Sequence, residues 1–242
     1  MVQIGFKCNR GVVRENNEDA CFVIPSHDVY IVADGVGGNN SGEVASRTAV
    51  SEVAAFVNDH DLSERKSPEE IFGFFSEALQ VANDKIYRTG AENPENRGMA
   101  TTVVLAYIRD GKAYIANIGD SRAYLFRKGR LKKITKDHTY VNQLIEEGVI
   151  TEDEAETHQQ KNVITRALGA EHSVAPDFYK VGLSAGDILM LCSDGLYGEV
   201  EGPEMAKLLR GEGSMNDLCA RLVEAAIEAG GRDNITVICV KI

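Results

Sequence analysis

The chain of 242 residues has no tryptophan, only five cysteines and five prolines, and no long apolar or basic tract. No apolar run approaches the roughly 20 residues that a helix needs to cross a bilayer, and the first residues lack the regions of a signal peptide. The formal net charge of −11 argues against nucleic acid as a partner. We therefore expect a soluble globule with neither a membrane nor a nucleic-acid partner.

The few cysteines exclude a disulfide scaffold. Their count is odd, and Cys8, Cys21, Cys192 and Cys239 lie in apolar, strand-like runs. Such cysteines are typical of small buried hydrophobic residues in a reducing compartment. We therefore expect a cytoplasmic protein.

Three aspartates follow apolar runs and stand beside a glycine: Asp34, Asp120 and Asp194. The preceding runs are short, rich in β-branched and aromatic residues, and stopped by glycine, which predicts buried strands. One Asp-Gly pair after a strand is an ordinary turn. The recurrence of the same arrangement favours a shared site.

Two further aspartates stand at the opposite end of apolar runs, since Asp19 precedes residues 20–24 and Asp233 precedes residues 235–240. In an antiparallel sheet the end of one strand lies beside the start of its neighbour. All five carboxylates can therefore gather at one edge, where they would repel each other unless cations neutralised them. Oxygen ligands without a histidine or cysteine cluster favour Mg²⁺ or Mn²⁺ over Zn²⁺. The strand order thus predicts a divalent-metal site.

The rest of the pattern predicts antiparallel sheets covered by helices, because strands, paired helices and further strands do not alternate as in a βαβ fold. Helices are expected at about residues 45–56, 68–89 (ended by Gly90 and Pro94) and 215–229, and strands at 2–7, 20–24, 29–33, 101–108, 112–118, 122–126, 131–134, 174–181, 188–192 and 235–240. A short helix and an exposed acidic flap are expected at about 138–164. Without linkers or repeats, residues 1–242 are predicted to form one domain.

Eight short motifs occur in a specific order along the whole chain. They are Arg14 with Glu18 and Asp19; Asp34 and Gly35 with Gly37, Gly38, Gly42 and Glu43; Met99 to Thr102; Gly119 to Arg122; Asp137 to Thr139; Thr165 to Gly169; Ser193 to Gly195; and Gly231 to Asn234. Each motif is weak alone, but the ordered set resembles the metal-dependent serine/threonine protein phosphatases of type 2C (PPM), in their compact bacterial form.

The resemblance implies an α+β fold, a four-layer α-β-β-α sandwich of two packed antiparallel sheets flanked by helices. It also implies two tightly bound Mg²⁺ or Mn²⁺ ions at one edge and a third, weaker ion near the flap. Asp34 would bridge the tight pair, and Gly35 would offer its carbonyl to one of these ions. Asp194 and Asp233 would bind the other.

The resemblance gives other residues supporting roles in the same site. Asp120, with Asp194, would hold the third ion, while Glu18, Asp19 and Asn234 would hold metal-bound waters or orient ligands. Two divalent ions ~3.5–4 Å apart can lower the pKa of a shared water from 15.7 toward ~7, which makes an in-line nucleophile without a covalent enzyme intermediate.

Arg14 is implied to bind the phosphate, because its planar guanidinium can bond two phosphate oxygens at once. The alternative is that Arg14 is an ordinary surface arginine exposed to solvent. For Arg122 and Arg166 we expect structural pairing with a neighbouring acid, and for His138 a capping or packing role.

The sequence departs from the family pattern at two positions. Val36 and Asn39 replace the methionine and histidine that the bacterial form usually carries. Asn39 cannot titrate as a general acid, so a metal-bound water could protonate the leaving oxygen instead.

The predicted function is hydrolysis of phosphoserine and phosphothreonine in proteins by a monomer, opposing a bacterial serine/threonine kinase of eukaryotic type that is itself a candidate substrate. A catalytically silent binding module remains an alternative, but its signature would be loss of a metal aspartate. A phosphatase of anti-sigma antagonist proteins and an unrelated two-metal nuclease are further alternatives.

Overall fold

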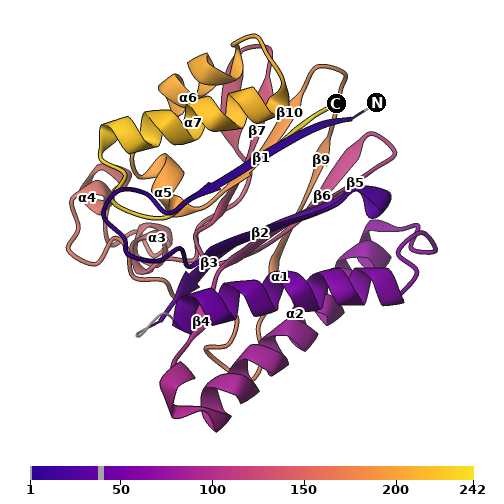
Figure 1. Cartoon of the computed structure of the whole chain (residues 1–242), viewed down its shortest axis with the longest axis vertical. Helices are drawn as coiled ribbons and strands as arrows, with labels where there is room; N and C mark the ends of the chain where they lie inside the picture. The colour runs from indigo at the N-terminus through magenta and orange to yellow at the C-terminus, as the bar shows by residue number, and fades with distance from the viewer. Residues whose placement is uncertain (1, 38–40) are drawn as a thin grey trace.

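The computed structural model describes residues 2–37 and 41–242, so the expectations for Gly38 and Asn39 lie outside the described residues. Two antiparallel sheets form the centre of the molecule (Figure 1). The first has the strand order β1-β11-β10-β7-β8, with β1 Gln3–Asn9, β11 Ile235–Lys241, β10 Ile188–Cys192, β7 Arg122–Arg127 and β8 Arg130–Lys133. The first and last strands of the chain are therefore neighbours.

The second sheet has the order β2-β3-β5-β6-β9, and the short β4 pairs with β3. These strands are β2 Asp19–Ile24, β3 Val29–Val36, β4 Ala100–Thr101, β5 Val103–Arg109, β6 Lys112–Ile118 and β9 Asp177–Gly182. The hairpin from β5 to β6 turns at Asp110 and Gly111, which both have positive φ as a tight two-residue turn requires.

Helices cover the outer face of each sheet (Figure 1). α1 Ser41–Asp59 and α2 Pro68–Glu92 lie on the second sheet, while α6 Gly202–Leu209 and α7 Met215–Ala229 lie on the first. α2 and α7 begin with capping boxes, in which Ser67 pairs with Glu70 and Ser214 with Asp217. The expected four-layer α+β sandwich is confirmed.

Three apolar layers hold the sandwich together. Tyr30, Val104 and Leu189 belong to the layer between the sheets, which also contains Ile238. The other two layers lie between each sheet and its helices. Burial of these side chains stabilises the four layers and leaves polar groups at the rims of the sheets.

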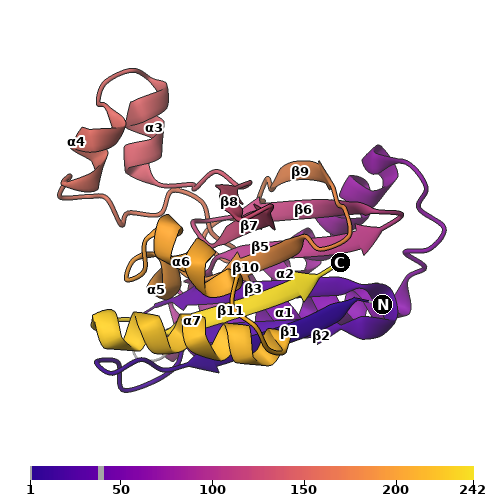
Figure 2. The same cartoon turned by 90° about the horizontal axis from the view of Figure 1, so that it is seen from above.

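The segment between β8 and β9 projects from the sandwich (Figure 2). It carries α3 Tyr140–Glu146 and α4 Glu152–Glu156, with Thr139 and Thr151 as N-caps. This is the expected position of the flap, and a second helix stands where an irregular acidic stretch was expected.

Several local expectations were wrong. Cys8 is exposed and Cys21 is half-buried, since both lie on edge strands, whereas Cys192 and Cys239 are buried as expected. α2 continues through Gly90 to Glu92, β9 begins only at Asp177, and α5 Asp194–Tyr197 and α6 were not expected. No helix in residues 2–37 and 41–242 is long and apolar enough to span a membrane.

Candidate metal centre

Asp19 and Asp34 lie opposite each other on neighbouring strands. Asp19 opens β2 and pairs in register with Asp34 near the end of β3. Two threonines fix the Asp34 backbone from the other side. Thr102 Oγ1 accepts from the Asp34 N–H at 3.0 Å, and Thr101 Oγ1 donates to the Asp34 carbonyl at 2.9 Å.

Asp194 and Asp233 come from the other sheet. Asp194 begins α5 two residues after β10, and Asp233 stands two residues before β11, the neighbour of β10. Gly195 packs so tightly on the Asn234 carbonyl that a β-carbon there would overlap it. Only glycine therefore allows the starts of α5 and β11 to approach this closely.

Ser193 joins the two sheets at this edge. Its hydroxyl donates to Asp19 Oδ2 at 2.7 Å and accepts from the Thr236 N–H at 3.0 Å. The four aspartates Asp19, Asp34, Asp194 and Asp233 thus meet at one edge of the sandwich, and we call this group the acidic rim.

Asp120 is buried in the connection from β6 to β7, where the chain passes from one sheet to the other. The base of the flap bonds directly to this turn. The Gly119 N–H donates to His138 Nδ1 at 3.0 Å, the His138 N–H donates to the Gly119 carbonyl at 3.0 Å, and Asn117 Nδ2 donates to the Lys136 carbonyl at 3.1 Å.

Burial and mutual repulsion raise the pKa values of these carboxyls. Burial is the main cause of a pKa of about 7 for Asp19 and for Asp120, and the charge of Asp194 adds to both. The pKa of Asp34 lies well above its usual range because of burial and then the charges of Asp19 and Asp194. Burial and the Asp233 charge raise the pKa of Asp194, against a hydrogen bond with Asp34. Negative charge here needs a cation.

The residues present fit divalent cations. Asp19 Oδ1 is buried without a hydrogen-bond partner among the described residues, and such an orphaned carboxylate oxygen is costly unless a ligand satisfies it. The Gly35 backbone packs against the Gly42 carbonyl with no space for a side chain, so it presents bare backbone beside Asp34. Within residues 2–37 and 41–242, no group of three acidic, histidine or cysteine side chains is arranged to coordinate one ion. A backbone carbonyl or water would therefore have to complete each coordination shell.

Arg14 is exposed at the mouth of the rim. Its Nη2 donates to Asp233 Oδ2 at 2.7 Å, so it touches a predicted metal ligand. This bond and the Asp233 charge raise the pKa of the guanidinium further. A guanidinium has five N–H donors, and this contact uses one of them.

Asn234 fastens the loop that carries Arg14. Its buried side chain donates to the carbonyls of Arg10 and Asn16 and accepts from the Glu18 N–H at 2.8 Å. The Glu18 carboxyl faces the same region, and burial, opposed by the charge of Arg14, raises its pKa. Asn234 therefore acts on the site through the loop backbone.

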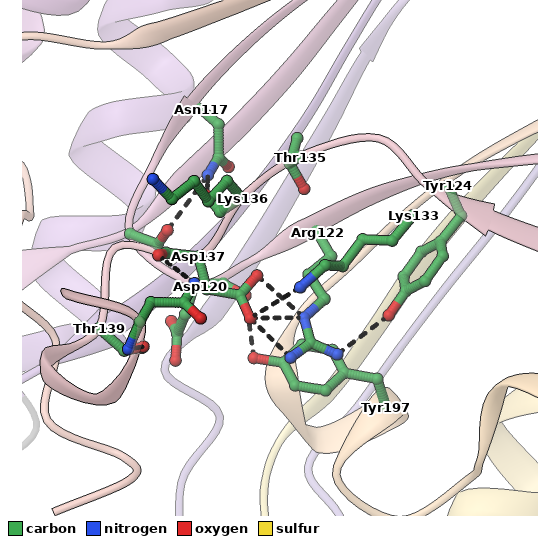
Figure 3. Close-up of polar contacts among 12 residues, drawn as sticks. Asn117, Asp120, Arg122, Tyr124, Lys133, Thr135, Lys136, Asp137, Thr139 and Tyr197 are labelled. Atoms are coloured by element: carbon green, nitrogen blue, oxygen red, sulfur yellow. Dashed lines mark hydrogen bonds and ion pairs between the residues drawn. The ribbon is translucent and has the colours of Figure 1, made fainter. Parts of the chain in front are cut away.

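The expected structural pairings of the other arginines and of His138 are present. Arg122 bonds to Asp137 through Nε at 3.0 Å and Nη2 at 2.6 Å (Figure 3), and Arg166 bonds to Asp177 at 2.8 Å. His138 is buried, and its Nε2 faces Asp177 Oδ2 at 3.2 Å. Nδ1 accepts from the Gly119 N–H at 3.0 Å, and Nε2 also lies 3.1 Å from Arg166 Nη1.

Sequence reasoning missed Ser193 and Tyr197. Ser193 stood inside a recognised motif, but its bond to Asp19 spans 174 positions. No sequence pattern pointed to Tyr197, because its role depends on helix α5, which was not expected. Its hydroxyl donates to the Asp120 carbonyl at 2.9 Å.

Comparisons with known proteins agree on one family. The model of the protein phosphatase 2C family matches residues 12–235. The serine/threonine phosphatase stp of Listeria welshimeri is 36% identical over 241 residues, which cover 98% of this chain and 94% of that protein.

Solved structures give the same result. The serine/threonine phosphatase of S. agalactiae superposes with a TM-score of 0.93 at 33% identity and covers 100% of both chains. The catalytic domain of the serine threonine protein phosphatase PstP, solved in complex with two manganese ions, has a TM-score of 0.86 at 33% identity and covers 99% of this chain and 97% of that one.

Proposed function

The chain belongs to the protein phosphatase 2C family, and on this premise we propose that it hydrolyses phosphoserine and phosphothreonine in proteins with bound Mg²⁺ or Mn²⁺. One observation carries the proposal: four aspartates from two sheets converge at one edge, with a buried carboxylate oxygen that lacks a partner among the described residues. Such a cluster is stable as an ionised group only when cations neutralise it.

We assign the tight pair of ions to three aspartates of the rim and to the backbone carbonyl of Gly35. Asp34 and the Gly35 carbonyl would hold one ion, and Asp34 with Asp194 and Asp233 would hold the other. The two manganese ions in the solved PstP domain support a pair. When bound, the ions supply an acidified water as the nucleophile and neutralise the charge of the phosphate.

A third, weaker ion is assigned to Asp120 with Asp194. The charge of Asp194 raises the pKa of Asp120, which supports their proximity. Glu18 and Asp19 hold water or orient ligands around the ions. Asn234 keeps its positioning role through the loop.

Arg14 binds and orients the phosphate of the substrate. It is exposed at the entrance, one of its donors already reaches Asp233, and its remaining N–H groups can bond phosphate oxygens in pairs. Because Arg14 touches Asp233, the phosphate would sit next to the rim, where hydrolysis requires it.

The whole chain is proposed to act as one catalytic domain, with the flap at about 138–164 beside the site. Phosphorylated proteins are the substrates, and a serine/threonine kinase is one candidate among them. We place the protein in the cytoplasm as a monomer, and its five free cysteines are typical of a reducing compartment.

The test is hydrolysis of p-nitrophenyl phosphate and of phosphoserine and phosphothreonine peptides, with Mn²⁺, with Mg²⁺ and with excess EDTA. We expect turnover of all three substrates with either metal and none with EDTA. Hydrolysis of bis-p-nitrophenyl phosphate in preference to the monoester would indicate a diesterase. Tight Mn²⁺ binding without any turnover would indicate a silent binding module instead.

A further inference from the structure

α5 carries a predicted metal ligand and an aromatic residue one turn apart. The helix begins at Asp194 and ends at Tyr197, three residues later. Residues at this spacing lie on the same side of a helix. The position of the Tyr197 ring is therefore tied to that of the Asp194 carboxyl.

The Tyr197 hydroxyl reaches the turn that holds Asp120. It donates to the Asp120 backbone carbonyl at 2.9 Å, across 77 positions of the chain (Figure 3). Because α5 begins at Asp194, this bond brings the Asp120 turn to the same short helix, and two ionised carboxylates that lie near each other repel. Tyr197 thus connects two mutually repelling carboxylates through a short helix and a single hydrogen bond.

Arg122 fixes the Tyr197 ring. Its guanidinium carbon lies 3.4 Å from the ring centroid, a cation–π contact. The Asp137 carboxylate in turn accepts hydrogen bonds from two guanidinium nitrogens of Arg122, and Lys133 Nζ lies 3.3 Å from the same carboxylate (Figure 3). The ring therefore has little freedom, and its hydroxyl is directed at the Asp120 carbonyl.

We propose that Tyr197 is a positioning residue that sets the separation of Asp120 and Asp194 and thereby the affinity of the weaker cation. The proposal rests on the function proposed above, which assigns that cation to Asp120 and Asp194. Tyr197 bonds to the backbone carbonyl of Asp120 and acts through the position of the turn. Without the hydroxyl, the Asp120 turn can move away from Asp194, which relieves their repulsion and opens the site.

The chain offers a matched control in Tyr124. Its hydroxyl accepts from Arg122 Nη1 at 3.1 Å, so it contacts the same guanidinium, and its ring is buried in the same apolar layer that Tyr197 packs against. Among the described contacts, however, Tyr124 makes no bond to Asp120. Removing either hydroxyl deletes one hydrogen bond near Arg122, and only one of the two deletions frees the Asp120 turn.

The experiment is calorimetric titration of Mn²⁺ into EDTA-stripped and dialysed full-length wild type, Tyr197→Phe and Tyr124→Phe. We expect the weak class of sites to lose about threefold to tenfold in affinity in Tyr197→Phe, the value of one hydrogen bond. The tight class should stay within twofold of wild type in both variants, and the weak class should stay within twofold in Tyr124→Phe. The thermal unfolding midpoint of each stripped protein reports general loss of stability separately.

Equal changes in the two variants, or an unchanged weak class in Tyr197→Phe, would overturn the proposal. A wild type that binds tight Mn²⁺ but has no weaker class would also overturn it, while leaving the proposed function intact. A wild type that binds no Mn²⁺ would overturn both.

Discussion

Two groups of aspartates in this chain have opposite surroundings. Asp137, Asp177 and Asp187 each bond to an arginine. Asp187 accepts hydrogen bonds from both Nε and Nη2 of Arg127. These bonds to arginine lower the pKa of Asp177, against desolvation, and of Asp187.

In the acidic rim, in contrast, only Asp233 makes a salt bridge within residues 2–37 and 41–242, and its partner is Arg14. The pKa values of Asp19, Asp34 and Asp194 are raised. The difference teaches that an acid paired with arginine stabilises the fold. Buried acids that lack enough neighbouring cations, in contrast, indicate a ligand-binding site.

The largest expected effect separates the two groups by activity. Asp34→Asn should lower Mn²⁺-dependent turnover of p-nitrophenyl phosphate by more than about 100-fold, because even residues that only orient a metal ligand cost 10–100-fold. The matched control is Asp187→Asn, the same change at a paired acid, which should keep wild-type turnover. Similar losses in both variants would remove the distinction between rim and scaffold.

The second effect is on stability. Asp137→Ala should lower the free energy of unfolding by about 3 kcal/mol, because it leaves the half-buried Arg122 beside Lys133 without a counter-charge. Urea unfolding measures the change. Glu204→Ala removes an acid from an exposed pair with Lys207 and should change stability by at most about 1 kcal/mol. A cost for Asp137→Ala no larger than that of Glu204→Ala would show that Arg122 is not held by this acid.

The third effect is the pH dependence of the metal-free protein. The folded-state pKa of Asp19 is about 7, above the unfolded value of about 3.9, so the folded state binds the extra proton between these values. Stability from this group is therefore present at low pH and is lost as the pH rises toward 7. Relative to Asp19→Asn in EDTA, wild type should lose up to about 2 kcal/mol between pH 5 and pH 7.

Measuring both proteins at each pH cancels the titrations that they share. One of these is His138, whose pKa is lowered by burial and which makes the opposite contribution. A constant difference between wild type and Asp19→Asn across this range would contradict the raised pKa.

The smallest effect is also a pH dependence of stability, but it has the opposite sign and concerns Asp187, one of the aspartates paired with arginine. The bonds from Arg127 lower the pKa of Asp187 below its unfolded value of about 3.9, so its contribution is full above pH 4 and is lost as the pH falls through the folded value. Since the Arg127 side chain is 39% exposed, the contribution is at most about 1 kcal/mol. Urea unfolding of wild type and Asp187→Asn from pH 6 to pH 3 should show the two stabilities converging, and divergence at low pH would refute the pairing.

Strand polarity was enough to predict much of the rim. In an antiparallel pair, an aspartate at the start of one strand lies beside an aspartate at the end of its neighbour. Asp19 in β2 and Asp34 in β3 meet in this way, in register. The starts of α2 and α7 were equally predictable, since their N-cap residues Ser67 and Ser214 can be recognised from the local sequence.

Contacts between distant residues could not be predicted in the same way. The bond from Arg14 to Asp233 spans 219 positions, and no local pattern states which acid the guanidinium will meet. α5 is four residues long and starts at Asp194 itself, so no helical periodicity could develop. Gly90 is tolerated inside α2 because packing of the helix against the sheet outweighs the local preference of glycine.

The central claim is that the acidic rim is a cation site that is unsatisfied by the protein alone. The most direct test is the thermal unfolding midpoint of wild type and Asp34→Asn, each in EDTA and in excess Mn²⁺. Binding to the folded state alone stabilises by about 2.7 kcal/mol at a concentration 100-fold above Kd, so the wild-type midpoint should rise by several degrees and that of Asp34→Asn by much less. An equal rise in both proteins, or none in wild type, would contradict the account.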